Sequence, residues 1–218
     1  RQMCIRDSLI YNDTDLKVQN PFECETEDDG YIYTQKELNF SSNTKDVGDC
    51  IRLYIEIDND IVNNKGGAVG ATNYVTGLFN QSIILYSNDQ IGMTINEIFA
   101  WTTTSPYSST SSSGMLSDFQ ANTGAINGDL GHLVSYQASG GIAAGFSGIC
   151  ASNIDNSKCF SSINSTFANV PTYSWSVMVV THEMGHLIGS RHTHACVWNG
   201  NGTAIDGCSG QTEGSCSL

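Results

Sequence analysis

The sequence predicts an α/β domain in which a sheet of strands is flanked by helices. Three observations support this prediction. Residues 51–57 alternate apolar with polar side chains, residues 68–79 carry apolar side chains at helical spacing, and a second strand pattern follows at about 91–101. The alternation of strand and helix patterns then continues as far as a helix expected at about 174–188.

The first three elements rest on the period of their apolar residues. The first strand alternates Ile51, Leu53, Ile55 and Ile57 with polar or amphipathic residues, which is typical of a half-buried strand. The second strand begins with the same alternation and loses it before its end. The helix between them is identified by one set of apolar residues at helical spacing: Ala68, Ala71, Val75, Leu78 and Phe79.

The later elements follow in order. A Ser-rich loop at 105–113 precedes a short helix carrying Met115, Leu116 and Phe119, and a third strand is expected at 129–136. Residues 140–151 are Gly-rich and predict an extended segment. The helix at 174–188 has one apolar face that we expect to be buried, made of Val177, Val180, Met184 and Leu187.

Composition limits the classes of function. The chain has 218 residues, enough for one domain with a proper core, and its formal net charge is −13. Such a charge disfavours binding to nucleic acid or anionic membranes. No stretch approaches the 18 or so consecutive apolar residues of a membrane span. The many Gly, Ser, Asn and Thr residues with few Lys suit a secreted, extracellular protein, and we favour a monomer.

The chain contains eight cysteines and no CxxC pair, which disfavours a thiolate zinc site. The short spacings predict local disulfides in an oxidising compartment. We expect Cys150 to pair with Cys159 and Cys196 with Cys208, and Cys24 with Cys50 is a plausible third pair. Without Cys4, which lies in a segment treated below as an artefact, Cys216 is then left for a partner elsewhere.

The strongest functional signal is the stretch HEMGHLIGSRH at 182–192. On a helix, His182 and His186 lie on one face, with Cβ atoms about 5–6 Å apart, so both imidazoles can bind one zinc ion. Gly189 can adopt a positive φ and end the helix, which lets the chain reverse and bring His192 back as a third ligand. The fourth position is left for water, as in catalytic zinc sites.

This stretch resembles the HExxHxxGxxH signature of the metzincin zinc endopeptidases at every specified position. The resemblance implies that His182, His186 and His192 bind Zn²⁺. It also implies that Glu183 is the general base, taking a proton from the zinc-bound water and passing it to the leaving amine. The expected substrate is a protein or peptide.

The order of elements also resembles the metzincins, of which the reprolysin-like (adamalysin-like) proteases of bacterial type are the most similar. The resemblance implies an α+β zincin fold: a mixed, twisted sheet with an antiparallel edge strand, flanked by helices that include the zinc helix. The edge strand, within about 141–149, would bind substrate through Gly141, Ile142, Ala143, Ala144 and Gly145. Thr193 stands where these enzymes usually have Asp. No Met follows His192, so we expect the chain to end before the Met-turn of the family.

The N-terminal part predicts three stretches. Residues 1–8, RQMCIRDS, resemble a translated sequencing adapter, and we expect them to be an artefact. Residues 9–48 are polar and acidic and form either the end of a pro-segment or the entry into the catalytic domain, which we place at 49–218. A cysteine in a pro-segment can cap the zinc, but NPFECETEDD around Cys24 does not match known switch motifs.

Several alternatives stay open. His194 could replace His192 as ligand if the turn were longer, and a zincin with Glu213 as third ligand is a further option.

His132 is expected to be an ordinary hydrogen-bonded histidine, and 141–149 could be a loop without a substrate role. Acidic runs at 23–29 and 56–60 could hold Ca²⁺, although solvated acidic loops are commoner. A non-catalytic binding or adhesion module on a zincin scaffold is the alternative function, which the presence of Glu183 disfavours.

Overall fold

The computed structural model describes residues 24–31, 33–34, 50–198, 202–205, 213 and 216. These residues fall into two compact units. We call residues 24–27 and 50–191 the sheet unit, and the remaining described residues, which include 192–198, 213 and 216, the C-terminal unit. The expected adapter segment 1–8 and most of 9–48 lie outside the described residues.

The sheet unit contains one mixed sheet of five strands in the order β2-β1-β3-β5-β4. Four strands run parallel, and β4 is antiparallel to β5 at the edge, so the predicted mixed sheet with an antiparallel edge strand is confirmed. The strands are β1 (Ile51–Ile57), β2 (Met93–Ala100), β3 (Leu130–Ser135), β4 (Gly141–Ala143) and β5 (Lys158–Ser162).

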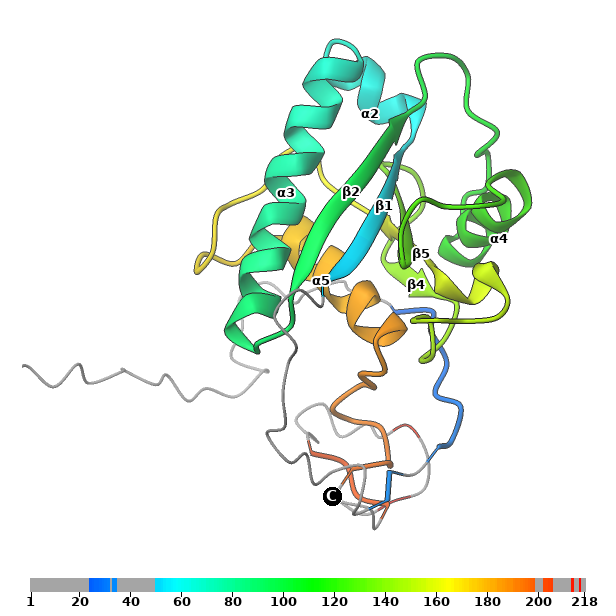
Figure 1. Ribbon diagram of the computed structural model, residues 1–218, viewed down its shortest axis with the longest axis vertical. Helices are drawn as coiled ribbons and strands as arrows, with labels where there is room; N and C mark the ends of the chain where they lie inside the picture. The colour runs from blue at the N-terminus through cyan, green and yellow to red at the C-terminus, as the bar shows by residue number, and fades with distance from the viewer. Residues whose placement is uncertain are drawn as a thin grey trace, which may run out of the picture. The chain divides into compact units, whose positions relative to one another are not determined.

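Helices cover both faces of this sheet (Figure 1). On one face, α3 (Ala68–Asn88) and α5 (Trp175–Leu187) enclose the larger apolar core, and the predicted buried face of α5 is confirmed. On the other face, α4 (Ser112–Asn122) packs over a smaller cluster around Phe119 and Phe160. A short helix, α2 (Asn59–Asn64), and a 3₁₀ turn, η2 (Ile154–Ser157), complete the unit. No described helix is long and apolar enough to cross a membrane.

The first strand is buried on both faces, which corrects the expectation of a half-buried strand. Its apolar residues enter the larger core, while Tyr54 and Glu56 enter the opposite side. The Glu56 carboxylate accepts hydrogen bonds from the Trp101 indole (2.6 Å), the Tyr54 hydroxyl (2.9 Å) and the Thr123 hydroxyl (2.9 Å). The polar half of the alternation therefore marks a buried polar network rather than solvent.

Two local features explain where sequence patterns failed. Strand β2 loses its alternation because of a bulge: Leu53 pairs with Ile95, but Tyr54 pairs with Glu97. The extra residue shifts the faces of the strand. Strand β5 was not predicted, because its sequence KCFSS is mostly polar although every residue is buried. Its Lys158 ammonium, buried at the strand start, pairs with the Asp155 carboxylate at 2.8 Å.

The predicted disulfides are wrong where the structure describes them. Cys196 pairs with Cys216, with their Cα atoms 5.5 Å apart, and Cys208 lies outside the described residues. Cys24, Cys50, Cys150 and Cys159 form no disulfide in the described part of the chain. For Cys150 and Cys159 the reason is burial. The Cys159 side chain lies in the core, whereas Cys150 is exposed, so their short spacing in the sequence does not bring the two sulfurs together.

Candidate metal centre and active site

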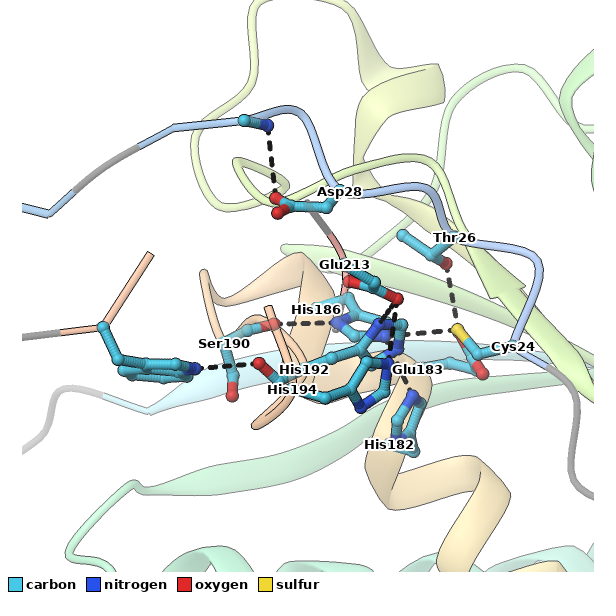
Figure 2. A network of polar contacts seen from close by, with 12 residues as sticks. Cys24, Thr26, Asp28, His182, Glu183, His186, Ser190, His192, His194 and Glu213 are labelled. Atoms are coloured by element: carbon cyan, nitrogen blue, oxygen red, sulfur yellow. Dashed lines mark hydrogen bonds and ion pairs between the residues drawn. The ribbon is translucent and has the colours of Figure 1, made fainter. Parts of the chain in front are cut away.

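Helix α5 presents two imidazoles one turn apart. His182 and His186 have their Nε2 atoms 2.9 Å apart, and their rings meet edge to face with centroids 4.5 Å apart (Figure 2). Two nitrogens at adjacent corners of a zinc tetrahedron lie about 3.3 Å apart, given Zn–N bonds of about 2.0–2.1 Å. The pair therefore fits one metal ion with only a small rotation of either ring.

The end of α5 fixes the ring of His186. The amide N–H of Gly189 donates to the His186 carbonyl (2.8 Å) and that of Ser190 to the Gly185 carbonyl (2.9 Å), which together form a Schellman cap. Gly189 has φ 103°, as its expected role in ending the helix requires. The turn then places the Ser190 carbonyl 2.7 Å from His186 Nδ1. Because Nδ1–H donates to this carbonyl, Nε2 is the nitrogen that remains for a metal.

Phe146 and Arg191 support the same ring from the side. The Phe146 ring meets His186 edge to face at 5.2 Å between centroids, and the Arg191 guanidinium lies over Phe146 at 4.4 Å. No sequence pattern identifies Phe146, because the contact joins the Gly-rich segment to the helix end. These contacts restrict the ring orientation of His186 through packing as well as hydrogen bonding.

Glu183 is buried beside the two histidines. Its Oε1 is buried and has no hydrogen-bond partner among the described residues, while Oε2 accepts from the Thr26 hydroxyl at 3.5 Å. Burial raises the pKa of the Glu183 carboxyl well above its ordinary value, and hydrogen bonds from Thr26 and Cys24 oppose that rise. A buried carboxylate oxygen without a partner is costly unless water or a ligand reaches it. Among the described residues, Glu183 Oε1 therefore lacks the donor that a buried carboxylate oxygen ordinarily has.

Residues 24–27 lie in this site. The Cys24 Sγ is 3.4 Å from His186 Nε2 and 4.0 Å from Glu183 Oε2 (Figure 2). The possible ligand atoms of Cys24, His182 and His186 all lie within 4.8 Å of one another. A thiolate and two imidazoles at this spacing form a set that zinc prefers. Sequence reasoning assigned Cys24 to a disulfide with Cys50 and gave little weight to this position.

The same segment is bonded to the edge strand. Cys24 and Gly141 form a parallel bridge, and the Glu25 amide donates to the Gly141 carbonyl at 3.1 Å. One residue on, the Thr26 hydroxyl accepts from the Ala143 amide at 2.7 Å. The predicted substrate residues Gly141, Ile142 and Ala143 thus form β4, with its outer edge paired to the chain's own residues 24–26. Beyond the strand, Ala144 donates to the Lys158 carbonyl, and Gly145 has φ 141°.

Glu25 anchors this segment to a helix. Its carboxylate accepts from the amides of Ser112 (3.3 Å) and Ser113 (2.7 Å) at the start of α4. These are amides that the helix itself leaves without partners, and the helix dipole favours a negative charge there. Three consecutive residues, 24–26, therefore connect the candidate ligand histidines, the edge strand and α4.

In the C-terminal unit, His192 lies beside a carboxylate. His192 Nδ1 is 2.6 Å from Glu213 Oε1, and His194 Nε2 is 3.0 Å from the same oxygen. The rings of His192 and His194 stack with centroids 4.8 Å apart. Glu213, which the sequence offered only as an alternative zinc ligand, thus contacts the expected third ligand directly.

The acidic run at 56–60 gives no support to calcium binding. Glu56 is occupied by the donors of its buried network, and the Asp58 and Asp60 carboxylates accept from the Ser135 hydroxyl at 2.7 Å and 2.9 Å. His132 is a buried histidine bonded to the Ser161 hydroxyl at 2.8 Å. The three carboxylates and His132 Nε2 thus each have a hydrogen-bond partner within the fold.

Comparison with known families agrees with this site. A model of metallo-peptidase family M12, of the type named Reprolysin_5, matches residues 48–217, which is most of the chain. The chain belongs to this family. The M12 domain is therefore a metalloprotease domain whose family implies zinc dependence and protein or peptide substrates. No curated protein matches the chain.

Proposed function

We propose that this M12 domain is a secreted zinc endopeptidase that hydrolyses internal peptide bonds. The observation that carries the proposal is the convergence of His182 Nε2 and His186 Nε2 beside the buried Glu183 carboxylate. Two ligand nitrogens, and an acceptor oxygen without a partner among the described residues, suit a hydrolytic zinc site. His192 is the proposed third ligand on the spacing of the motif.

Each protein group has a defined role. His182, His186 and His192 would hold Zn²⁺, which when bound supplies Lewis acidity toward water and the scissile carbonyl. Glu183 takes a proton from the attacking water and delivers it to the leaving nitrogen. Its raised pKa suits this exchange, because a carboxyl of higher pKa is a stronger base. The alternative of a non-catalytic module is weaker, because a scaffold has no need of a buried carboxylate beside the two histidines.

The substrate would bind as an added strand on β4. Gly141 and Ala143 offer backbone groups on the edge that does not face β5. Their small side chains leave this edge open to another main chain, and a peptide here would pass the Glu183 carboxylate. Substrate recognition would then depend on main-chain hydrogen bonds more than on side-chain charges.

Residues 24–27 would make this form of the enzyme latent. They occupy both the β4 edge and the vicinity of His186, so a substrate and the segment cannot bind together. The Cys24 thiol would also take the metal position that water needs. Activity therefore requires the segment to be displaced or cut.

The first experiment measures cleavage of an unfolded protein by the full chain, before and after treatment with a thiol-modifying reagent that releases Cys24. We expect cleavage after treatment, loss of cleavage with a chelator, and recovery with zinc. Glu183→Ala should bind zinc and lose turnover by orders of magnitude. Glu97→Ala, which removes an acid on β2, is the matched control. A zinc-loaded, thiol-treated parent without cleavage would favour the binding module.

A further inference from the structure

The second histidine-containing group in the structure surrounds His192, and it includes a carboxylate that the proposed mechanism does not use. The side chain of His192 is only 5% exposed, and its Nδ1 lies 2.6 Å from Glu213 Oε1. We propose that Glu213 is a positioning residue for the metal centre: it holds the His192 ring and fixes the tautomer that can bind zinc. This proposal rests on the proposed function, in which His192 is a zinc ligand.

The tautomer argument follows from the chemistry of imidazole. A carboxylate can only accept, so the 2.6 Å contact requires a proton on His192 Nδ1. In the neutral ring Nε2 then carries the lone pair, which is the form of the nitrogen that binds a metal. In carboxylate–histidine–zinc arrangements the carboxylate fixes the tautomer and the ring orientation of the ligand.

The backbone holds Glu213 in place on both sides. Its amide donates to the His194 carbonyl at 3.0 Å, and its carbonyl accepts from the Cys196 amide at 3.1 Å. The Cys196–Cys216 disulfide closes the loop three residues beyond Glu213. Two hydrogen bonds and a covalent bond thus fix a carboxylate far along the chain beside the motif histidine. A surface acid that paired by chance would not need this support.

His194 shares the same carboxylate oxygen but is a weaker candidate for the positioned ligand. Its contact with Glu213 is longer, at 3.0 Å, and its side chain is 40% exposed against 5% for His192. An exposed ion pair contributes little, whereas a buried hydrogen bond to a charged group contributes more. The carboxylate therefore acts mainly on His192.

A metal ion is the competing occupant of the group formed by His192, His194 and Glu213. Ligand atoms of His192, His194 and Glu213 lie within 4.8 Å of one another, and Glu213 Oε2 is buried without a hydrogen-bond partner among the described residues. A metal ion bound here would use His192 Nδ1 and would compete with the positioning role. The two arrangements predict different zinc stoichiometries, which makes them separable.

The test measures zinc affinity and stoichiometry of the full chain by competition with a chromophoric chelator. We compare the parent with Glu213→Ala, Glu213→Gln and the control Glu97→Ala. Glu213→Ala should weaken zinc binding by about 10- to 100-fold. Glu213→Gln should recover part of the loss, because the amide oxygen still accepts from Nδ1–H. The visible spectrum of the cobalt-substituted protein should shift in Glu213→Ala and remain parental in the control.

Each outcome decides the proposal. Unchanged zinc affinity and cobalt spectrum in Glu213→Ala would overturn it, even if the parent binds zinc and cleaves protein. Two zinc ions in the parent and one in Glu213→Ala would replace it with a second metal site. If Glu213→Ala loses its near-ultraviolet circular dichroism, Glu213→Gln decides, because it keeps the size and the hydrogen bond. Zinc affinity recovered in part or in full relative to Glu213→Ala supports the proposal, and a loss as large as that of Glu213→Ala overturns it. A parent that binds no zinc would instead refute the proposed function.

Discussion

Gly141 lies directly against the Glu183 carboxylate, where a Cβ atom at residue 141 would stand 2.5 Å from Oε1 and 2.7 Å from Cγ. The edge strand and the active-site helix therefore approach each other at a point where only glycine fits. Gly141→Ala should push the carboxylate out of position, and a displacement near 1 Å lowers turnover by about 100-fold. The measurement is kcat on a protein substrate, with zinc content determined in parallel.

Zinc content separates this prediction from general damage. His182 and His186 are unchanged, so Gly141→Ala should keep its metal. Gly124→Ala is the matched control, because nothing lies within 4 Å of a Cβ there. If Gly141→Ala matched the control in kcat, Glu183 would have room to move and the strand would not restrain it.

Removing the Cys24 thiol should activate the enzyme. The thiol approaches His186 Nε2 to 3.4 Å, and a charged hydrogen bond or ligand contact of this kind contributes about 1.5–3 kcal/mol. Its loss in Cys24→Ala should raise the fraction of open sites, and hence the initial rate of cleavage, by about 10- to 100-fold. Cys50→Ala removes an exposed thiol and should leave the rate at the parental value.

Breaking the contact between Glu25 and the start of α4 is a second way to displace residues 24–27 from the site. Glu25→Ala removes the acceptor for the Ser112 and Ser113 amides and leaves the thiol intact. We expect a smaller rise in initial rate than for Cys24→Ala, together with faster amide hydrogen exchange at residues 24–27. Amide exchange as slow as in the parent, together with a parental rate of cleavage, would show that the hydrogen bonds to β4 hold residues 24–27 in place without Glu25.

Elements whose apolar residues recur with a regular period could be predicted from the sequence. Elements defined by tertiary contacts could not. The helix with His182 and His186 was predicted with its buried face and its glycine stop, because spacing alone determines them. Strand β5 was missed because burial of polar residues leaves no periodic signal. Cys24 was assigned to the wrong partner, since its position follows from backbone pairing with Gly141 across more than a hundred residues.

His132 predicts how stability responds to acid. It is fully buried between strands, with Nε2 bonded to the Ser161 hydroxyl, and burial lowers its pKa from 6.5 to about 3. Between these values the unfolded chain binds a proton that the folded chain does not, so the free energy of unfolding decreases as the pH falls. The decrease from this residue is at most about 1.4 kcal/mol per pH unit, and above pH 6.5 it vanishes.

His132→Gln tests this dependence, because the amide can bond to Ser161 but cannot titrate. Metal loss and the other acidic groups affect both proteins alike, so the difference between their stabilities isolates His132. Denaturant unfolding at pH 7.5, 6 and 5 should show the stability of the parent falling relative to the variant below pH 6.5. Parallel curves across this range would mean that His132 takes up its proton in the folded state, and that the strand interior admits a charge there.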